Sequence, residues 1–262
     1  MRLYALLEGN AETELEDREI TGITNDSRNV EEGYLFVCIK GEHFDGHTKA
    51  AEMLEKGAAA VVVERDLGLG KQQILVPNTY IFYGQLCAAW FGHPEREMTF
   101  IGVTGTNGKT TTTALTGEIM KDYYESVFVV GNIGIPYTST AALTRPDSVT
   151  VAEISSFQLE TIMDFRPNVS AILNITPDHL NRHGTMENYI RIKECITLNQ
   201  TKEDAVVLNY DDPVLREFGQ NPELKPRVIW FSSREMLKDG FCMDGDNIVY
   251  CQNGRQTVVV NV

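Results

Sequence analysis

Short apolar runs separated by polar stretches recur along the chain and predict alternating strands and helices. From residue 99 onward these runs are nearly continuous in apolar side chains, which is typical of parallel strands covered on both faces. The predicted strands occupy 100–103, 127–130, 149–154, 169–174, 205–209 and 228–231. With helices between the strands, the pattern predicts an α/β fold built on a mainly parallel, doubly wound sheet.

The two ends of the chain depart from this pattern. Residues 1–97 predict a smaller α/β unit, with a strand at 34–39, a helix at 50–56 and a strand at 58–63. Charge and proline interrupt the apolar pattern at 92–97, so we divide the chain into domains 1–97 and 98–262. Near the other end, the pattern predicts a hairpin over 240–251 that turns at 244–247, followed by a strand at 257–260.

The stretch from Phe100 to Leu115 predicts a phosphate-binding loop between a strand and a helix. Glycines let the backbone turn with its N–H groups inward, and Lys109 adds a positive charge at the helix N-terminus. Thr110 is the hydroxyl that such loops use to reach a magnesium ion. Val103 replaces one expected glycine, so the loop is a variant, and a glycine-rich turn without a ligand is the alternative. The expected phosphate-binding residues are Gly105, Thr106, Asn107, Gly108, Lys109, Thr110 and Thr111.

Three further residues could complete a metal-dependent site. Glu153 lies near the end of an otherwise apolar strand, where a carboxylate could hold Mg²⁺; the alternative is an acid facing solvent. His179 follows the strand 169–174 and could bind a second cation while Asp178 orients its ring. Lys193 shares one face of a predicted helix over 186–199 with apolar residues, for which a lysine that extends its charge into solvent is the ordinary explanation.

The net charge and the cysteine content limit the classes of partner that we expect for this protein. The net charge of −14 argues against nucleic acid or an anionic membrane surface. The cysteines form no C-x-x-C pair and are odd in number, so we expect neither a zinc site nor a disulfide framework, and reduced thiols at Cys38, Cys87, Cys195, Cys242 and Cys251. The first residues are too short an apolar run for a secretory segment and no run reaches membrane length, so we expect a cytoplasmic protein.

Four motifs in the expected order resemble the central domain of the Mur ligases. They are Thr-Gly-Thr-Asn-Gly-Lys-Thr-Thr at 104–111, Gly-Asn-Ile-Gly-Ile-Pro at 131–136, Glu-Ile-Ser-Ser-Phe-Gln-Leu at 153–159 and Asn-Ile-Thr-Pro-Asp-His-Leu-Asn-Arg-His at 174–183. Enzymes of this family use ATP to add amino acids to the UDP-N-acetylmuramoyl peptide precursor of peptidoglycan. The variant glycine loop is the family's own form.

The two halves resemble different family members. The motifs at 131–134 and 153–160 are most similar to the member that adds D-glutamate to UDP-N-acetylmuramoyl-L-alanine. The segments 26–28 and 41–47 resemble the UDP-binding first domain of the member that adds the third residue, a diamino acid or lysine. We therefore expect D-glutamate addition, with third-residue addition as the alternative.

The resemblance also implies roles for single residues. Lys109 and the loop amides would bind the phosphates of ATP, and two Mg²⁺ ions would be held by Thr110 with Glu153 and by His179 with Lys193. That lysine is commonly carbamylated in the family. Catalysis would involve Lys109, Glu153, His179 and Lys193. Substrate would contact Asp26, Ser27, Arg28, Asn132 and Ser155.

The implied reaction passes through an acyl phosphate, formed by phosphoryl transfer from ATP to the terminal carboxylate of the precursor and consumed by the amine of the amino acid. The family has a third, Rossmann-like domain that these 262 residues do not contain. We therefore expect the chain alone to bind nucleotide weakly and to ligate poorly. A P-loop kinase or nucleotidase, and a non-catalytic nucleotide-binding fragment, are the competing interpretations.

Overall fold

The structure is a computed structural model that describes residues 1–41 and 44–262. Two compact units divide the chain, Met1–Pro94 and Glu95–Val262. Each unit is a parallel or mainly parallel sheet with helices, which confirms the predicted α/β fold class. None of the helices formed by these residues has the length and apolar character needed to cross a membrane.

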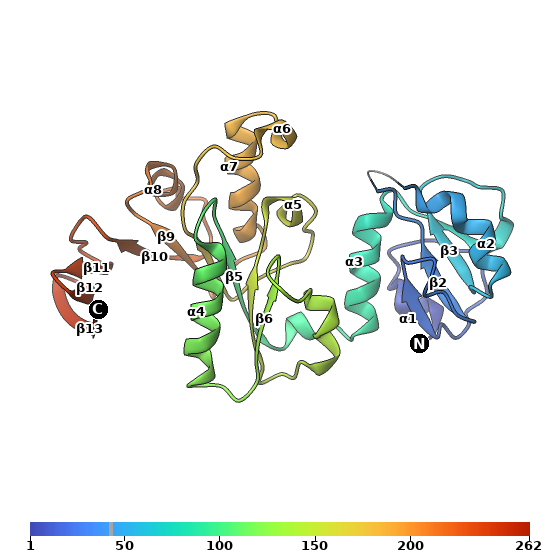
Figure 1. The fold of residues 1–262 in the computed structure, drawn as a ribbon, viewed down its shortest axis with the longest axis horizontal. Helices are drawn as coiled ribbons and strands as arrows, with labels where there is room; N and C mark the ends of the chain where they lie inside the picture. The colour runs from blue at the N-terminus through green and yellow to red at the C-terminus, as the bar shows by residue number, and fades with distance from the viewer. Residues whose placement is uncertain (42–43) are drawn as a thin grey trace. The chain divides into compact units, whose positions relative to one another are not determined.

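The first unit is built on a parallel sheet of four strands in the order β1-β2-β3-β4. These are β1 (Gly22–Thr24), β2 (Tyr34–Val37), β3 (Ala60–Val63) and β4 (Gln73–Leu75), with the helices α1 (Leu3–Leu7), α2 (Ala50–Glu55) and α3 (Thr79–Trp90) (Figure 1). The strands and the helix predicted in this region are present as β2, β3 and α2.

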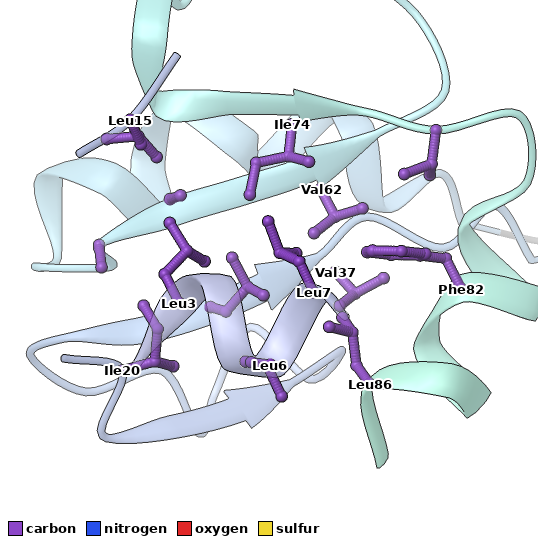
Figure 2. Close-up of a cluster of buried hydrophobic side chains, with 14 of the residues drawn as sticks. Leu3, Leu6, Leu7, Leu15, Ile20, Val37, Val62, Ile74, Phe82 and Leu86 are labelled. Atoms are coloured by element: carbon purple, nitrogen blue, oxygen red, sulfur yellow. The ribbon is translucent and has the colours of Figure 1, made fainter. Parts of the chain in front are cut away.

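The sequence of strand β3 is apolar at every position because both faces of the strand are buried. Successive side chains point to opposite faces, so Val62 packs with α1 and α3 in one core, while Val61 and Val63 pack against α2 in another. Figure 2 shows the first core, where Leu3, Leu7 and Phe82 meet the strands. Full burial of each such side chain contributes about 1.5–3 kcal/mol.

The second unit contains a sheet of nine strands in the order β13-β12-β11-β10-β9-β8-β5-β7-β6. The strands from β10 to β6 run parallel, and β11, β12 and β13 form an antiparallel extension that confirms the predicted hairpin. Their bounds are β5 (Thr99–Thr104), β6 (Val127–Gly131), β7 (Val149–Glu153), β8 (Val169–Ile172), β9 (Ala205–Asn209), β10 (Arg227–Ser232), β11 (Gly240–Asp244), β12 (Asn247–Gln252) and β13 (Arg255–Asn261).

Helices cover both faces of this sheet. Met120 of α4 (Lys109–Lys121) belongs to the core on one face, while α7 (Met186–Glu194) and α8 (Pro213–Gly219) pack on the other. The chain leaves β5 through α4 to reach β6, and β7 and β8 then pair with opposite sides of β5. The chain therefore reverses its direction of winding beside β5, and ligands of such sheets bind in the crevice at the carboxyl ends of strands at this point.

The predicted helix over 186–199 is wrong in its length. The α-helix ends at Glu194 and a 3-10 turn follows over Cys195–Thr197. The Thr197 hydroxyl donates to the Glu194 carbonyl at 2.9 Å, a local side-chain bond that competes with continued α-helix. The inward face itself is as predicted, because Tyr189, Ile192 and Lys193 are all buried.

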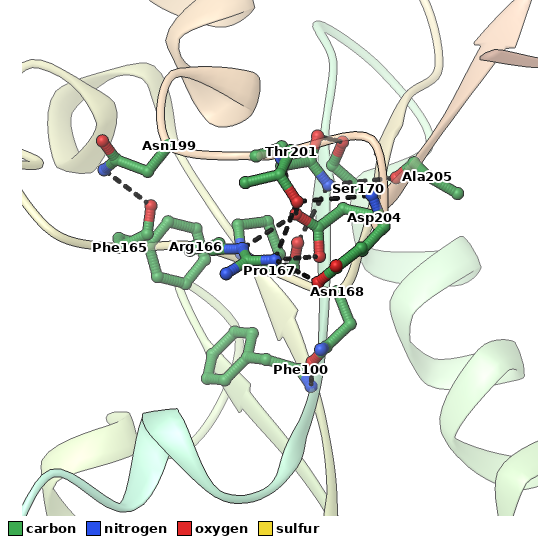
Figure 3. A network of polar contacts seen from close by, with 12 residues as sticks. Phe100, Phe165, Arg166, Pro167, Asn168, Ser170, Asn199, Thr201, Asp204 and Ala205 are labelled. Atoms are coloured by element: carbon green, nitrogen blue, oxygen red, sulfur yellow. Dashed lines mark hydrogen bonds and ion pairs between the residues drawn. The ribbon is translucent and has the colours of Figure 1, made fainter. Parts of the chain in front are cut away.

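Polar side chains hold together the amino ends of β8 and β9. Arg166 donates to both carboxylate oxygens of Asp204, at 2.8 and 3.3 Å (Figure 3). The side-chain amide of Gln200 donates to the Pro167 and Ala205 carbonyls at 2.9 and 3.0 Å. Asn168 accepts from the Phe100 N–H at 2.7 Å, which ties β5 to the same region. Burial alone would raise the pKa of Asp204, but the hydrogen bonds from Arg166 and Thr201 outweigh it and lower the pKa.

Candidate functional site

The glycine-rich loop lies between β5 and α4, at the carboxyl end of β5. Gly105 has φ +147°, and a Cβ there would lie 3.2 Å from the Leu173 Cβ and 3.3 Å from the Asn174 carbonyl oxygen. Gly108 has φ +81° and occupies the N-cap of α4. Both positions therefore favour glycine, one because the backbone approaches the β8 loop closely and both because of the positive φ.

The loop after β8 holds this turn in place. The Asn174 carbonyl accepts from the Thr106 N–H at 2.9 Å, and its side-chain oxygen accepts from the Asn107 N–H at 2.8 Å. The Thr106 hydroxyl donates to the Thr176 carbonyl at 3.1 Å. Thr106 and Asn107 thus fix the shape of the loop with their own polar groups, and two of the predicted motifs, 104–111 and 174–183, are brought together.

The start of α4 has the geometry of an anion-binding helix N-terminus. The first N–H groups of a helix have no intrahelical acceptor, and Gly108 offers no side-chain cap. The N–H groups of Lys109, Thr110 and Thr111 therefore face the loop at the positive end of the helix dipole. The Lys109 ammonium donates to the Thr106 carbonyl at 2.8 Å, within the same turn.

Glu153 ends β7 beside this helix and is buried, with 3% of its surface exposed. Its two carboxylate oxygens accept from the Thr110 hydroxyl at 2.7 Å and the Asn132 side-chain amide at 3.0 Å. Among the described residues it has no ion pair within 4.0 Å. A buried carboxylate bonded to neutral donors retains a strong demand for a cation, and the solvent-facing alternative is excluded.

Gly131 and Asn132 place the amide beside this acid. The Gly131 φ of +105° brings the backbone against Glu153, so a side chain there would collide with the Glu153 carbonyl. The Asn132 N–H then donates to that same carbonyl at 2.9 Å. The motif 131–136 is thereby joined to β7.

Lys193 reaches the same edge from α7 and is 2% exposed, which excludes a side chain extended into solvent. Its ammonium donates to the Gly105 carbonyl at 2.8 Å and the Thr104 hydroxyl at 3.1 Å. Burial, together with the positive charge of Lys109, lowers the pKa of Lys193 to about 7, against the opposite influence of Asp178 and Glu153.

His179 occupies a more open position. It has φ +50° at the N-cap of α6 (Leu180–His183), with Nε2 3.4 Å from an Asp178 carboxylate oxygen and its ring 5.0 Å from Phe157. Asp178 is thus beside the ring, as predicted. Within the described residues, His, Cys, Asp and Glu side chains form no group of three that could hold a metal, so Glu153 and His179 are not parts of one such cluster.

Sequence reasoning missed a second histidine, the buried His183, and its acidic neighbour Glu160. His183 has Nε2 3.0 Å from the Ser156 hydroxyl and Nδ1 3.0 Å from a Glu160 carboxylate oxygen. Burial lowers the pKa of His183, although Glu160 acts in the opposite direction. The spacing of four residues from His179 was the available signal, because it places both rings on one side of a short helix.

The remaining predicted residues have partners of their own. Ser155 caps α5 (Ser156–Leu159) in a reciprocal capping box with Gln158. In the first unit, Arg28 pairs with Asp26 at 2.7 Å and lowers the pKa of that carboxyl to about 2, while Ser27 accepts from Lys56 through its carbonyl.

Part of the segment 41–47 falls at Glu42 and His43, outside the described residues. Of the rest, His47 is buried, with its Nδ1 2.6 Å from the Asp45 carboxylate, and its Nε2 accepts from the Glu64 N–H at 3.0 Å. These two side chains therefore hold the loop against β3.

Comparison with known proteins agrees with the fold and the motifs. The Mur ligase middle domain matches residues 103–261, and the Mur ligase family catalytic domain matches residues 19–84. A protein of Lachnoclostridium phytofermentans named UDP-N-acetylmuramoylalanine–D-glutamate ligase is 59% identical over 160 residues, which cover 61% of this chain and 35% of that protein. A protein of the same name from Lachnospira eligens is 56% identical over 162 residues, covering 62% and 36%.

Solved structures show the same fold across both units. A UDP-N-acetylmuramoyl-L-alanyl-D-glutamate–2,6-diaminopimelate ligase superposes with a TM-score of 0.76 at 21% identity, covering 99% of this chain and 59% of that one. MurF ligase from Thermotoga maritima, solved in complex with ADP, gives 0.62 at 24% identity and covers 90% and 57%. This chain therefore spans little more than a third of the curated relatives it matches and under two thirds of these structures. The chain belongs to the Mur ligase family.

Proposed function

We propose that this chain carries the ATP site of a ligase that adds D-glutamate to UDP-N-acetylmuramoyl-L-alanine in peptidoglycan synthesis. The names of the relatives at 59% and 56% identity support the choice of D-glutamate. The observation that carries the proposal is Glu153, a buried carboxylate that accepts from Thr110 directly after the lysine of a phosphate-binding loop. A carboxylate and a hydroxyl in this relation are the pair that P-loop enzymes use beside the phosphates of a nucleotide.

The residues present fit a nucleotide with Mg²⁺. The N–H groups of Lys109, Thr110 and Thr111 and the Lys109 ammonium would bind the phosphates, while Gly105 and Gly108 leave room for a close approach. Thr110 and Glu153 would hold one cation, and His179 would hold the other together with Lys193. When bound, Mg²⁺ would neutralise negative charge on the transferring phosphoryl group.

Burial of Lys193, which lowers the pKa of its amine, makes this lysine suitable for carbamylation. At a pKa of about 7, a large share of the amine is neutral near neutral pH. A neutral amine adds to carbon dioxide, forming an N–C bond and losing one proton, which gives an anionic carbamate. The change would turn an unfavourable buried cation into a ligand for the second metal, within reach of Gly105 and Thr104.

The chemistry then follows from position and charge. The terminal carboxylate of the precursor attacks the γ-phosphorus of ATP, and ADP leaves. The amine of D-glutamate attacks the resulting acyl phosphate, the C–O bond breaks, and phosphate leaves with formation of an amide. Lys109 and the loop amides stabilise charge on the transferring group, and Asn132 would orient the acyl end beside Glu153.

The first unit would bind the uridine diphosphate part of the precursor, with residues 1–97 as the substrate domain and 98–262 as the ATP domain. Arg28 is 86% exposed at its side chain and pairs with Asp26, so its guanidinium can exchange a carboxylate partner for a diphosphate. The use of ATP as the phosphoryl donor supports a cytoplasmic location.

Third-residue addition is the second candidate. It is favoured by the residues at 26–28 and 41–47, and by the fact that the D-glutamate-adding relatives match 61–62% of this chain. The product of the first reaction is the substrate of the second, so one experiment separates them.

The test measures ATP-dependent phosphate release and amide formation with two substrate pairs. The first pair is UDP-N-acetylmuramoyl-L-alanine with D-glutamate, and the second is its D-glutamyl product with diaminopimelate or L-lysine. We expect turnover with the first pair and none with the second. Turnover with the second pair alone contradicts D-glutamate addition. Phosphate release that ignores both precursors, and that survives Lys193→Ala, identifies a nucleotidase instead.

The length of the chain needs its own measurement. We expect weak ATP binding and slow ligation by residues 1–262 alone, because the matched relatives are much longer. Normal ATP affinity without any binding of the muramoyl precursor would favour a non-catalytic nucleotide-binding fragment. Ligation at the rate of a full-length relative would contradict the expectation of weak activity.

A further inference from the structure

Three sulfur atoms meet in the antiparallel extension of the large sheet, far along the chain from the phosphate loop. Cys242 lies on β11, Cys251 on β12, and Met236 in the segment between β10 and β11. The Cys242 thiol donates to the Met236 sulfur at 3.3 Å, the two cysteine sulfurs are 3.5 Å apart, and Cys251 is 3.8 Å from Met236. The three atoms therefore form a nearly equilateral triangle.

The two cysteines lie in a small apolar cluster with Leu237 and Val249, in the antiparallel extension of the sheet. Both cysteines are 2% exposed, whereas Met236 is 50% exposed. Gln256 of β13 donates to the Met236 sulfur at 3.3 Å and so orients the thioether. The arrangement has two buried thiols, a half-exposed thioether and a side chain that orients that thioether, which are features expected of a metal site that is accessible from solvent.

A disulfide is the obvious alternative, and the sheet register opposes it. Cys242 pairs across the strands with Val249, and Cys251 pairs with Gly240, so the two cysteines are diagonal neighbours. Diagonal neighbours lie about 7–8 Å apart at Cα, while a disulfide usually needs about 4.4–6.8 Å. The thiols can approach each other, but a bond between them would require movement of the backbone.

We propose that Met236, Cys242 and Cys251 form a three-coordinate binding site for one Cu(I) ion. Two thiolates and a thioether are soft ligands, and a set of three sulfurs suits Cu(I) better than Zn²⁺, which prefers four tetrahedral ligands. Metal–sulfur bonds of about 2.3 Å around a planar three-coordinate ion place the sulfurs about 4 Å apart. The observed edges need to expand only slightly. On binding, each thiol loses a proton and forms a Cu–S bond, while the metal keeps its oxidation state.

Bound Cu(I) would link β11, β12 and the segment that precedes β11. It would therefore stabilise the antiparallel extension, in addition to having a measurable affinity. The site is independent of the proposed ligase chemistry, because none of its ligands belongs to the phosphate loop, β7 or α7.

The test uses the reduced 262-residue chain in the absence of oxygen, with Cu(I) supplied as its bicinchoninate complex. We expect the chain to remove one Cu(I) per molecule from the chelator, X-ray absorption to report three sulfur neighbours, and the midpoint of thermal unfolding to rise. Met236→Leu should weaken binding by at least about tenfold, and Cys251→Ser should abolish it.

Matched controls identify the ligands. Met243→Leu changes the neighbouring methionine of β11, and Cys195→Ser changes a cysteine outside the site; both should bind Cu(I) as the unchanged chain does. If the circular dichroism spectrum shows that Cys251→Ser does not fold, the Cu(I) affinity of Met236→Leu becomes the deciding measurement. The Met236 side chain is half exposed and leucine keeps a similar apolar volume, so this variant should fold. Equal binding by Met236→Leu and the unchanged chain, or an equal affinity for Zn²⁺, overturns the proposal.

Discussion

In the nine-stranded sheet, the buried charged side chains at the amino ends of the strands and those at the carboxyl ends have different kinds of partner. At the amino ends of β8 and β9, Asp204 is 3% exposed at its side chain and is paired with both nitrogens of the Arg166 fork. At the carboxyl end of β7, Glu153 is as deeply buried but accepts from a hydroxyl and an amide. Lys193 nearby likewise donates to neutral oxygens.

We infer that this difference separates the polar groups that stabilise the fold from those that serve the proposed ATP site. A buried charge that has a full partner costs little once the fold has formed, whereas one with neutral partners is retained at a continuing cost in stability. Such a cost is expected where a ligand completes the site. We therefore expect changes at the amino ends to alter stability, and changes at the carboxyl ends to alter ligand chemistry.

The largest effect is expected for Glu153→Gln. The amide keeps the size and one acceptor but loses the charge that would hold a cation, so the rate of ATP-dependent turnover should fall by about 10²–10³-fold. The free energy of unfolding should stay constant or rise by about 1 kcal/mol, because a buried charge is removed. Glu118→Gln, on the exposed face of α4, is the control. A large loss of stability with unchanged turnover would show that Glu153 stabilises the fold and does not take part in the ligand chemistry.

Gly131→Ala tests whether the carboxyl end depends on close backbone contact. A Cβ at this position collides with the Glu153 carbonyl and requires an unfavourable φ, so unfolding should become easier by about 3 kcal/mol. Gly134→Ala has a positive φ but open space around it, and should cost about 1 kcal/mol. Urea titrations of both variants measure the difference. Equal losses would show that contact with Glu153 contributes nothing.

Asp204→Asn tests the paired end. Loss of the charge leaves Arg166 with only the distant Glu203 as an acidic partner, and we expect a cost of about 2 kcal/mol after allowance for the partly exposed guanidinium. Turnover per folded molecule should be unchanged. Glu203→Gln removes a weaker, exposed contact of the same arginine, 3.8 Å long, and should cost less than about 0.5 kcal/mol. Similar losses for the two variants would remove the distinction between buried and exposed partners.

The most gradual effect, spread over several pH units, concerns the pH dependence of stability. The folded-state pKa of Lys193 is about 7, below its ordinary value of 10.5, so the folded state releases a proton that the unfolded state keeps. Stability should therefore increase by about 1 kcal/mol per pH unit from pH 7 to about pH 10. Lys193→Met should remove this slope in bicarbonate-free buffer. Parallel pH profiles for the two proteins would contradict the depressed pKa.

The sequence was sufficient for elements whose signals are local. Buried strands such as β7 are apolar at almost every position, and the loop before α4 has its glycines and lysine in a fixed order. Helix α3 was not predicted, because its own apolar residues occur on all sides of the helix and do not form one apolar face. Asn78 at its N-cap was the available sequence signal for the start of the helix.

The site was predictable as a set of residue types but not as a set of contacts. The bonds of Lys193 to Thr104 and Gly105 join residues 88 or 89 positions apart, and the pairing of His183 with Glu160 depends on how α5 meets α6 and α7. Such contacts arise from the order of strands around β5, which the hydrophobic pattern does not encode. Helix α7 was overextended for a local reason, the hydroxyl of Thr197.

The junction between the parallel and antiparallel parts of the large sheet is narrow. Strands β10 and β11 are in register at two pairs of residues, Phe231 with Phe241 and Ser232 with Cys242, whereas β11 and β12 pair over their whole length. The three terminal strands can consequently detach as one cooperative unit while the rest of the sheet stays folded. Their amide protons should exchange with solvent together, and sooner than those of β5, β7 and β8.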